Sequence, residues 1–162
     1  MLTKERLCEV LKYNKEDGCF TWIKTKKRVK AGQIAGRLNQ KGYRQIVIDG
    51  NYYMAHRLAW LYMHGHFPAF HIDHINGVKD DNRFSNLREA SSAENNRNVR
   101  ISSRNTSGVK GVSFSKDIGK WKAYCHDGEV NVHLGYFSEI RDAERMVREY
   151  RVKFHGEFAN HG

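Results

Sequence analysis

A histidine beside a carboxylate, followed by a series of asparagines, makes the segment 73–98 the part of the chain best suited to chemistry. Asp73 and His74 are adjacent, and Asn82, Asn86 and Asn95 follow within this segment. Asp and Asn side chains supply the oxygen ligands that Mg²⁺-type ions take. A neutral imidazole accepts a proton from water near pH 7, and a bound cation neutralises charge at a phosphate. These residue types and spacings therefore predict metal-assisted phosphodiester hydrolysis.

Short secondary-structure elements should position these side chains. Residues 70–75 predict a strand with Phe70 and Ile72 on one face, and Asn76-Gly77 predicts a turn after it. Residues 79–83 are too polar for a core and predict a loop. Residues 86–89 then predict a second short strand.

A helix should begin just after this second strand. Ser91 and Glu94 have the spacing of a capping box, in which each side chain bonds the other residue's backbone N–H. Asn95 would then lie in the first helical turn, with Asp73 and His74 on the hairpin beneath it.

The order of these motifs resembles the HNH endonucleases of phage and homing type. The motifs that carry the resemblance are Asp73-His74-Ile75-Asn76-Gly77, Asn82, Ser85-Asn86-Leu87-Arg88 and Glu94-Asn95-Asn96. The resemblance implies a ββα-metal fold with His74 as general base. It implies that Asp73 and Asn95 hold one divalent ion, Mg²⁺ or alternatively Mn²⁺, and that Asn86 braces the loop and orients the histidine.

A further run, His-Arg-Leu-Ala-Trp from His56, extends this resemblance towards the N-terminus. We expect His56 to have a structural or DNA-proximal role and not a catalytic one. Before it, residues 2–11 predict a helix, residues 19–23, 43–49 and 51–54 predict strands, and Asp49-Gly50 predicts a hairpin turn. Residues 55–63 predict a second helix that ends before Pro68.

The chain is strongly basic, with a net charge of +10. Between residues 24 and 44 it carries Lys24, Lys26, Lys27, Arg28, Lys30, Arg37, Lys41 and Arg44 and no acidic residue. This density of like charge favours a polyanionic partner, although a solvated basic loop is the alternative. Beside a phosphodiesterase-like site we interpret Lys26, Lys27, Arg28 and Lys30 as contacts to double-stranded DNA. Arg88 and Arg97 are further cations that could clamp a phosphate, or only solvated charges.

The polar stretch 101–107 predicts a linker to a second unit. In that unit, residues 111–114, 120–124 and 132–137 predict short strands. Residues 139–154 predict an amphipathic helix with Ser138 as its N-cap. The expected arrangement is an antiparallel three-stranded sheet with one helix across a face.

Residues 107–160 resemble the DNA-binding domain of plant ethylene-response factors, the APETALA-two type. The matching marks are Gly111-Val112, Trp121-x-Ala123, Leu134-Gly135-x-Phe137, Ala143 and Gly156-Glu157-Phe158-Ala159. The resemblance implies DNA contacts from Lys110, Ser113, Ser115, Tyr124, His126 and His133. Strand alternation adds Lys120 and Lys122 on the face of Tyr124 and His126.

The second unit departs from the plant pattern at Ser113, Ser115 and His126, where the plant domains have arginines. Arginine forks on guanine are the commonest specific base contact. We therefore expect a target other than the GC-rich sites of the plant family, or less specific binding.

These observations predict an α+β protein in which a ββα-metal nuclease module is joined to a small three-stranded sheet packed on one helix. The predicted domains are 1–100, a linker at 101–107, and 108–162. We expect a monomeric, DNA-targeted HNH endonuclease located in the cytoplasm of a bacterial host if it is phage-encoded. A DNA-binding regulator with an inactive nuclease centre is the alternative, and an RNA-binding protein fits the charge but not the metal motif.

Composition excludes other classes. No apolar run approaches the ~20 residues of a membrane span. Cys8, Cys19 and Cys125 are odd in number and contain no Cys-x-x-Cys pair, which argues against a disulfide framework and a structural zinc site. We expect three reduced thiols.

Overall fold

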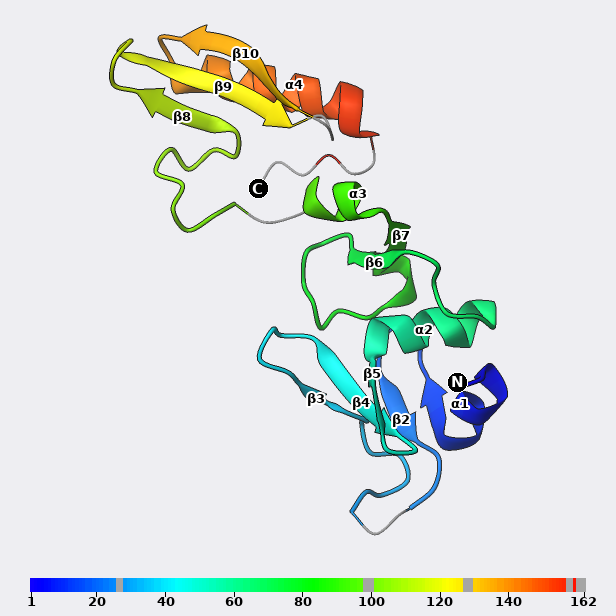
Figure 1. Ribbon diagram of the computed structural model, residues 1–162. Coiled ribbons are helices and arrows are strands. Elements are labelled where there is room, and N and C mark those ends of the chain that lie inside the picture. Colours follow the sequence, from blue (N-terminus) through cyan, green and yellow to red (C-terminus); the bar gives the residue numbers. More distant parts are fainter. Residues whose placement is uncertain (26–27, 98–100, 127–129, 157–158, 160–162) are drawn as a thin grey trace. The chain divides into compact units, whose positions relative to one another are not determined.

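The computed structural model describes residues 1–25, 28–97, 101–126, 130–156 and 159 (Figure 1). Its contacts divide the chain into two compact units, Met1–Ala90 and Ser91–Gly162. Helices and small antiparallel sheets occur in both, so the predicted α+β class is confirmed. The boundary at Ala90 and Ser91 lies before the predicted linker, and the domain limits taken from the sequence stay a prediction.

The first unit is built from short elements around one apolar core. In chain order they are α1 (Lys4–Val10), β1 (Leu11–Tyr13), β2 (Phe20–Trp22), β3 (Arg37–Leu38), β4 (Arg44–Ile48), β5 (Asn51–Met54), α2 (Ala55–His64), β6 (His71–His74), the 3₁₀ turn η1 (Phe84–Asn86) and β7 (Leu87–Ala90). β1 pairs with β2, β4 lies between β3 and β5, and β6 pairs with β7, all antiparallel. Leu7, Phe20, Ile46 and Leu58 are fully buried at the centre of the core.

The hairpin of β4 and β5 follows the sequence prediction closely. Ile48 pairs with Asn51 across the turn, and Asp49 and Gly50 both have positive φ, at 49° and 79°. Two positive φ angles are what a two-residue hairpin turn requires. α2 then begins directly after β5, as predicted, and ends at His64, with Gly65 as a C-cap in the left-handed conformation.

The predicted strand at residues 70–75 is confirmed only over His71–His74. Ile72 is buried, but Phe70 is 63% exposed and does not share its burial, so that part of the prediction was wrong. The Glu89 carboxylate accepts hydrogen bonds from the backbone N–H groups of Ala69 and Phe70, at 2.8 and 3.5 Å. These contacts to a side chain replace strand pairing at Phe70.

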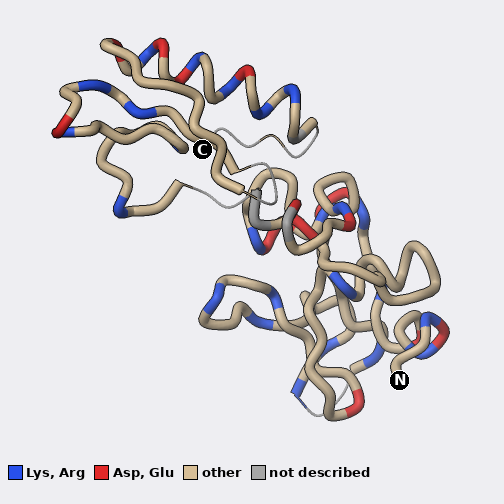
Figure 2. Tube along the Cα trace, turned by 45° about the horizontal axis from the view of Figure 1, so that its top comes forward, with Lys and Arg blue, Asp and Glu red and all other residues tan. Residues whose placement is uncertain are grey.

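The second unit contains α3 (Ser92–Arg97), β8 (Val112–Ser115), β9 (Lys120–His126), β10 (Asn131–Phe137) and α4 (Ile140–His155). β9 is the middle strand of an antiparallel sheet, and α4 contacts this sheet mainly through β9 and β10 (Figure 1). Val112, Ala123, Ala143 and Val147 form its buried centre. The predicted three-stranded sheet with one helix is therefore present. α4 carries Lys and Arg as well as Asp and Glu along its length (Figure 2).

Two helix starts were predicted in this unit, and one prediction was wrong. The capping box is confirmed, because Ser91 N donates to Glu94 Oε2 at 2.8 Å and Glu94 N donates to Ser91 Oγ at 3.3 Å. For α4, Glu139 and not Ser138 occupies the N-cap position, with no side-chain hydrogen bond to the helix. Packing of Ile140 and Ala143 on the sheet fixes this start without a local cap.

Candidate active site in the first unit

The β6–β7 hairpin carries Asp73 and His74 in a buried position. Asp73 pairs with Arg88 across the hairpin and His74 pairs with Leu87. As whole residues, Asp73 and His74 are each only 5% exposed. The hairpin thus shields the Asp73 carboxylate and the His74 imidazole from bulk solvent and holds the two residues next to each other on one strand.

Asp73 forms an ion pair with its cross-strand neighbour. Arg88 Nε and Nη2 donate to Asp73 Oδ2 at 3.0 and 2.9 Å, and the two side chains are 14% and 6% exposed. A buried charge needs such a partner to offset its lost hydration. Arg88, predicted to contact DNA, is therefore also the residue that holds the Asp73 carboxylate in place.

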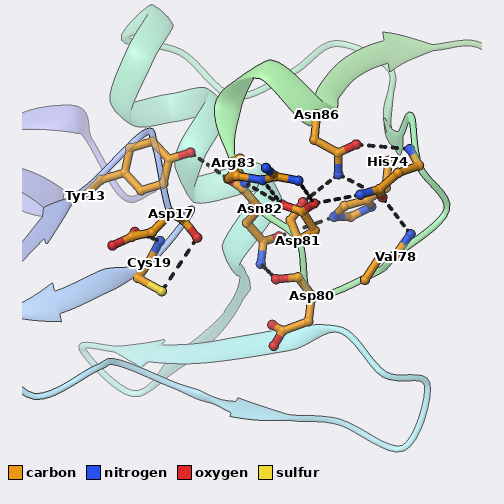
Figure 3. A network of polar contacts seen from close by, with 11 residues as sticks. Tyr13, Asp17, Cys19, His74, Val78, Asp80, Asp81, Asn82, Arg83 and Asn86 are labelled. Carbon is orange, nitrogen blue, oxygen red and sulfur yellow. Dashed lines mark hydrogen bonds and ion pairs between the residues drawn. The ribbon is translucent and has the colours of Figure 1, made fainter.

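His74 lies against the side chain of Asn82. His74 Nε2 is 3.3 Å from Asn82 Oδ1, and Asn82 Nδ2 donates to the Asp80 carbonyl at 3.0 Å (Figure 3). The second bond fixes the orientation of the amide, so its oxygen faces the imidazole. An amide oxygen only accepts hydrogen bonds, so Nε2 carries the proton and Nδ1 is the basic nitrogen of the neutral ring.

Burial lowers the pKa of His74 from its ordinary value. The contact with Asn82 and the charges of Asp73, Asp81 and Asp80 oppose this effect but do not cancel it. The imidazole is accordingly neutral at neutral pH, which is the form that accepts a proton.

Asn82 is a site residue for which the sequence suggested no role, although it belongs to the ordered series of asparagines. It is 1% exposed. Tyr13 Oη donates to the Asn82 carbonyl at 2.6 Å (Figure 3). Gly18, at φ 74°, packs so tightly here that a Cβ would lie 2.4 Å from Arg83 N and from Asn82 C. The β1–β2 hairpin therefore braces the chain where the Asn82 side chain meets His74.

Asn86 holds the loop that joins the two strands of the hairpin. Its Oδ1 accepts from Asn76 N at 3.0 Å, and its Nδ2 donates to Asn76 Oδ1 at 3.1 Å and to the Asp81 carbonyl at 2.8 Å. The side chain is 7% exposed. The Asn86 side chain therefore links both ends of the 76–81 loop, which is the bracing contact that the resemblance implied.

A second histidine packs against His74. The ring of His56 meets the ring of His74 edge-to-face, with ring centroids 5.1 Å apart. The ring centroid of Tyr43 lies 5.3 Å from that of His56. His56 is 8% exposed, and among the residues that the structure describes its Nδ1 has no hydrogen-bond partner. Burial, with smaller contributions from His74 and Arg57, lowers the pKa of His56 to about 3. His56 is therefore a neutral aromatic wall of the site.

The β3–β4 hairpin is fixed to the same loop. Arg44 Nε and Nη2 donate to the two carboxylate oxygens of Asp80, each at 2.8 Å. Lys79 Nζ donates to the Lys41 carbonyl at 3.0 Å and lies 5.1 Å from the centre of the Tyr43 ring. The basic segment 24–44 is thus anchored beside the site at its C-terminal end.

The other predicted site residues lie elsewhere. Arg28 and Lys30 are exposed in the basic segment, whereas Lys26 and Lys27 lie outside the described residues. Asn95 is half-buried on α3 of the second unit, where its N–H donates to the Ser91 carbonyl at 2.9 Å. Arg97 is also on α3, and its side chain lies outside the described part. The packing of α3 on the β6–β7 hairpin stays a prediction.

The DNA-contact residues predicted in the second unit are on or next to its sheet. Lys120, Tyr124, His126 and His133 are exposed, and Lys110, Ser113, Ser115 and Lys122 are half-buried. Along β9 the even-numbered residues are the more exposed and Ala123 and Cys125 are buried. The predicted alternation that places Lys120 and Lys122 with Tyr124 and His126 is therefore present.

The donor chemistry around Asp73 fits a hard cation that keeps several water ligands. In the described ranges no group of three or more His, Cys, Asp or Glu side chains could hold a metal ion. Asp73 is a single buried carboxylate, and Asn side chains are the other oxygen donors of the motif. Mg²⁺ is commonly bound by one or two carboxylates, with water and phosphate oxygens in its other positions.

Cys8, Cys19 and Cys125 are free cysteines in the structure, and Cys125 is buried. Within the ranges that the structure describes, there is also no helix of the length and apolar character needed to cross a membrane.

Comparison with known proteins defines the class to which this site belongs. Residues 53–97, which include His56, Asp73, His74 and Asn86, match the HNH endonuclease family. The chain belongs to this family. It is also 31% identical over 105 residues to Protein 3.8 of Escherichia phage T7, a match that covers 64% of this chain and 86% of that protein. No solved structure matches the chain.

Proposed function

We propose that the protein is a metal-dependent DNA endonuclease that hydrolyses phosphodiester bonds and is directed to its target by the second unit. The observation that carries the proposal is the contact of His74 Nε2 with Asn82 Oδ1, next to Asp73 and inside the HNH segment. This contact leaves Nδ1 as the base, and burial keeps the ring neutral.

In the proposed reaction, His74 Nδ1 takes a proton from a water molecule as its oxygen attacks phosphorus. One P–O ester bond breaks, and a phosphomonoester and an alcohol form after the leaving oxygen is protonated. The imidazolium then returns its proton to solvent. Asp73 and Asn95 would hold the divalent cation, Mg²⁺ or Mn²⁺, which supplies charge neutralisation at the phosphate and the leaving oxygen.

The surrounding residues orient the His74 base and the Asp73 carboxylate. Asn82 fixes the imidazole tautomer, Arg88 holds the Asp73 carboxylate, and Asn86 keeps the 76–81 loop closed. A catalytic base misplaced by about 1 Å loses much of its effect, so these contacts contribute to rate without touching substrate.

The second unit would supply target recognition. Its sheet presents Lys120, Tyr124 and His126 on the exposed side of β9, which suits contact with DNA in the manner of the ethylene-response-factor domains. The basic segment 24–44 of the first unit would add contacts that do not depend on sequence. We infer a monomer that acts in the cytoplasm of a bacterial host.

A plasmid-nicking assay with Mg²⁺ tests the proposal. His74→Ala should lose cleavage by about 10²–10⁴-fold and keep DNA affinity. His71→Ala is the matched control, because His71 is exposed on the same strand. Absence of cleavage by the wild-type protein, with DNA binding intact, would favour a regulator with an inactive nuclease centre.

A further inference from the structure

An ion pair joins the β3–β4 hairpin to the loop 76–81, and the proposed reaction gives it no role. Arg44 Nε donates to Asp80 Oδ1 and Arg44 Nη2 donates to Asp80 Oδ2, each at 2.8 Å. The two side chains are 21% and 31% exposed. A guanidinium and a carboxylate joined by two parallel hydrogen bonds fix each other's direction as well as their distance. The hairpin therefore holds the Asp80 side chain in one orientation.

Asp80 passes this constraint to the asparagine beside the imidazole. Its backbone carbonyl accepts two hydrogen bonds from Asn82, one from the side-chain Nδ2 at 3.0 Å and one from the backbone N at 3.1 Å. Asn82 Oδ1 in turn lies 3.3 Å from His74 Nε2 (Figure 3). The contacts thus run without interruption from the Arg44 guanidinium to the His74 imidazole.

The backbone that carries Arg44 is itself well fixed. The turn at residues 39–43 is closed by Asn39, whose Oδ1 accepts from Lys41 N at 2.9 Å and from Tyr43 N at 3.1 Å. The Asn39 backbone N donates to the Tyr43 carbonyl at 2.9 Å. Arg44 follows as the first residue of β4, the middle strand of its sheet. A guanidinium on such a backbone can hold its partner in place.

Two further contacts join the same turn to the site. Lys79 Nζ donates to the Lys41 carbonyl at 3.0 Å and lies 5.1 Å from the centre of the Tyr43 ring. The centre of the Tyr43 ring lies 6.0 Å from that of His74. The hairpin therefore meets the catalytic segment at Lys79, at Asp80 and at the imidazole itself.

We propose that Arg44 is a positioning residue for the His74 base. It acts through Asp80 and Asn82, and this role rests on the nuclease function proposed above. Its Nε and Nη2 donors already point at a carboxylate, and a DNA phosphate would have to displace that carboxylate to gain the same two bonds. Arg44 therefore affects the rate of cleavage and not the affinity for DNA.

The basic segment 24–44 would then serve two purposes. Arg28 and Lys30 are exposed cations that suit contact with phosphates. Arg44, at the end of the same segment, ties that surface to the loop that orients the base. A protein region that holds DNA and a loop that holds the base would behave as one rigid piece, which keeps the base aligned with bound DNA.

NMR on the full-length protein without metal tests this role without any cleavage. The ring ¹⁵N shifts of His74, assigned by comparison with His74→Ala, report which ring nitrogen carries the proton. Above neutral pH the wild-type ring should be protonated at Nε2. Arg44→Gln and Asp80→Asn should each shift it towards a mixture of the two neutral tautomers, because Asn82 Oδ1 is then held less firmly.

Single-turnover cleavage of supercoiled plasmid with Mg²⁺, at saturating protein, separates rate from affinity. Arg44→Gln and Asp80→Asn should each lower the rate by about three- to tenfold. The salt dependence of plasmid binding should stay unchanged. The double variant should lose no more than either single variant, because both changes break the same contact. Arg44→Lys should recover part of the rate, since an ammonium keeps the charge but not the two-bond geometry.

The matched control is Arg6→Gln. Arg6 donates to both carboxylate oxygens of Asp49 at 2.9 Å and so ties α1 to the β4–β5 turn with the same kind of contact. Its loss should leave both the His74 tautomer and the cleavage rate unchanged. If Arg44→Gln does not fold, Asp80→Asn, which keeps the shape of the side chain, still decides the question.

A wild-type tautomer population in both Arg44→Gln and Asp80→Asn would overturn the proposal, and so would an equal shift in Arg6→Gln. An unchanged rate with a salt slope lowered by about 0.9 would make Arg44 a phosphate contact instead. If the wild-type protein cleaves no DNA, the nuclease proposal fails. The His74 tautomer then still tests whether Arg44 positions the imidazole.

Discussion

His74 and Asn82 are eight residues apart, yet the Asn82 side-chain oxygen lies 3.3 Å from His74 Nε2 inside the buried centre of the first unit. Asn82 is itself held at three points: Tyr13 binds its carbonyl, its amide nitrogen donates to the Asp80 carbonyl, and Gly18 packs on its backbone. The orientation of the His74 imidazole, which we propose as the general base, is therefore set from the N-terminal hairpin.

Asn82→Ala should reduce cleavage by on the order of tenfold while leaving DNA affinity nearly unchanged, because a positioning contact acts on the rate and not on binding. Single-turnover cleavage and equilibrium binding measure the two effects separately. Asn51→Ala, at an exposed asparagine of β5, is the control and should change neither. Equal losses of rate and affinity in Asn82→Ala would indicate a folding defect instead.

Gly18→Ala should destabilise the protein by about 2 kcal/mol or more, because its left-handed backbone disfavours a side chain and the Cβ would meet the backbone of residues 82 and 83. Gly50→Ala shares the positive φ but has open space around it, so about 1 kcal/mol is expected there. Urea unfolding of both variants gives the difference. Equal effects would mean that Gly18 does not brace the site.

Cleavage should stop with EDTA and return with excess Mg²⁺ or Mn²⁺. Asp73→Ala and Asn95→Ala should each reduce activity, and a higher metal concentration should restore part of it, since one ligand is lost and water replaces it. Zinc should not be needed for folding, since the chain has no cysteine cluster. Full activity in chelator would contradict the proposed role of the metal.

Folding stability should fall as the pH drops below neutrality, in part through His56. Its pKa is about 3 in the folded protein against 6.5 ordinarily, so below pH 6.5 the unfolded chain binds a proton that the folded chain refuses. This one group should remove about 2 kcal/mol of stability between pH 7 and pH 5. His56→Phe should flatten the pH dependence of the unfolding free energy, and His71→Gln, at an exposed histidine, should not.

Deletion of residues 105–162 should weaken the cleavage-site preference, while the truncated protein should still cleave DNA. Residues 1–104 contain 19 Lys and Arg against 10 Asp and Glu, so affinity for any DNA should survive and fall steeply with salt. Cleavage of a random-sequence library at two salt concentrations compares the two proteins. An unchanged site preference in the truncated protein would move specificity to the basic segment 24–44.

The sequence determined the features that depend on neighbouring residues. The Asp49-Gly50 turn, the reciprocal caps of Ser91 and Glu94, and the alternation along β9 all follow from backbone preferences within a few positions. The ordered motif around His74 was equally local, so the family could be recognised before any contact was known.

Tertiary structure decided which side chains meet. Tyr13 and Asn82 are 69 positions apart, and nothing in either local pattern indicates their hydrogen bond. The packing of His56 on His74 depends on where α2 lies against the β6–β7 hairpin. Local sequence specifies backbone conformation. Contacts between distant residues depend instead on how all the apolar side chains of the core pack together.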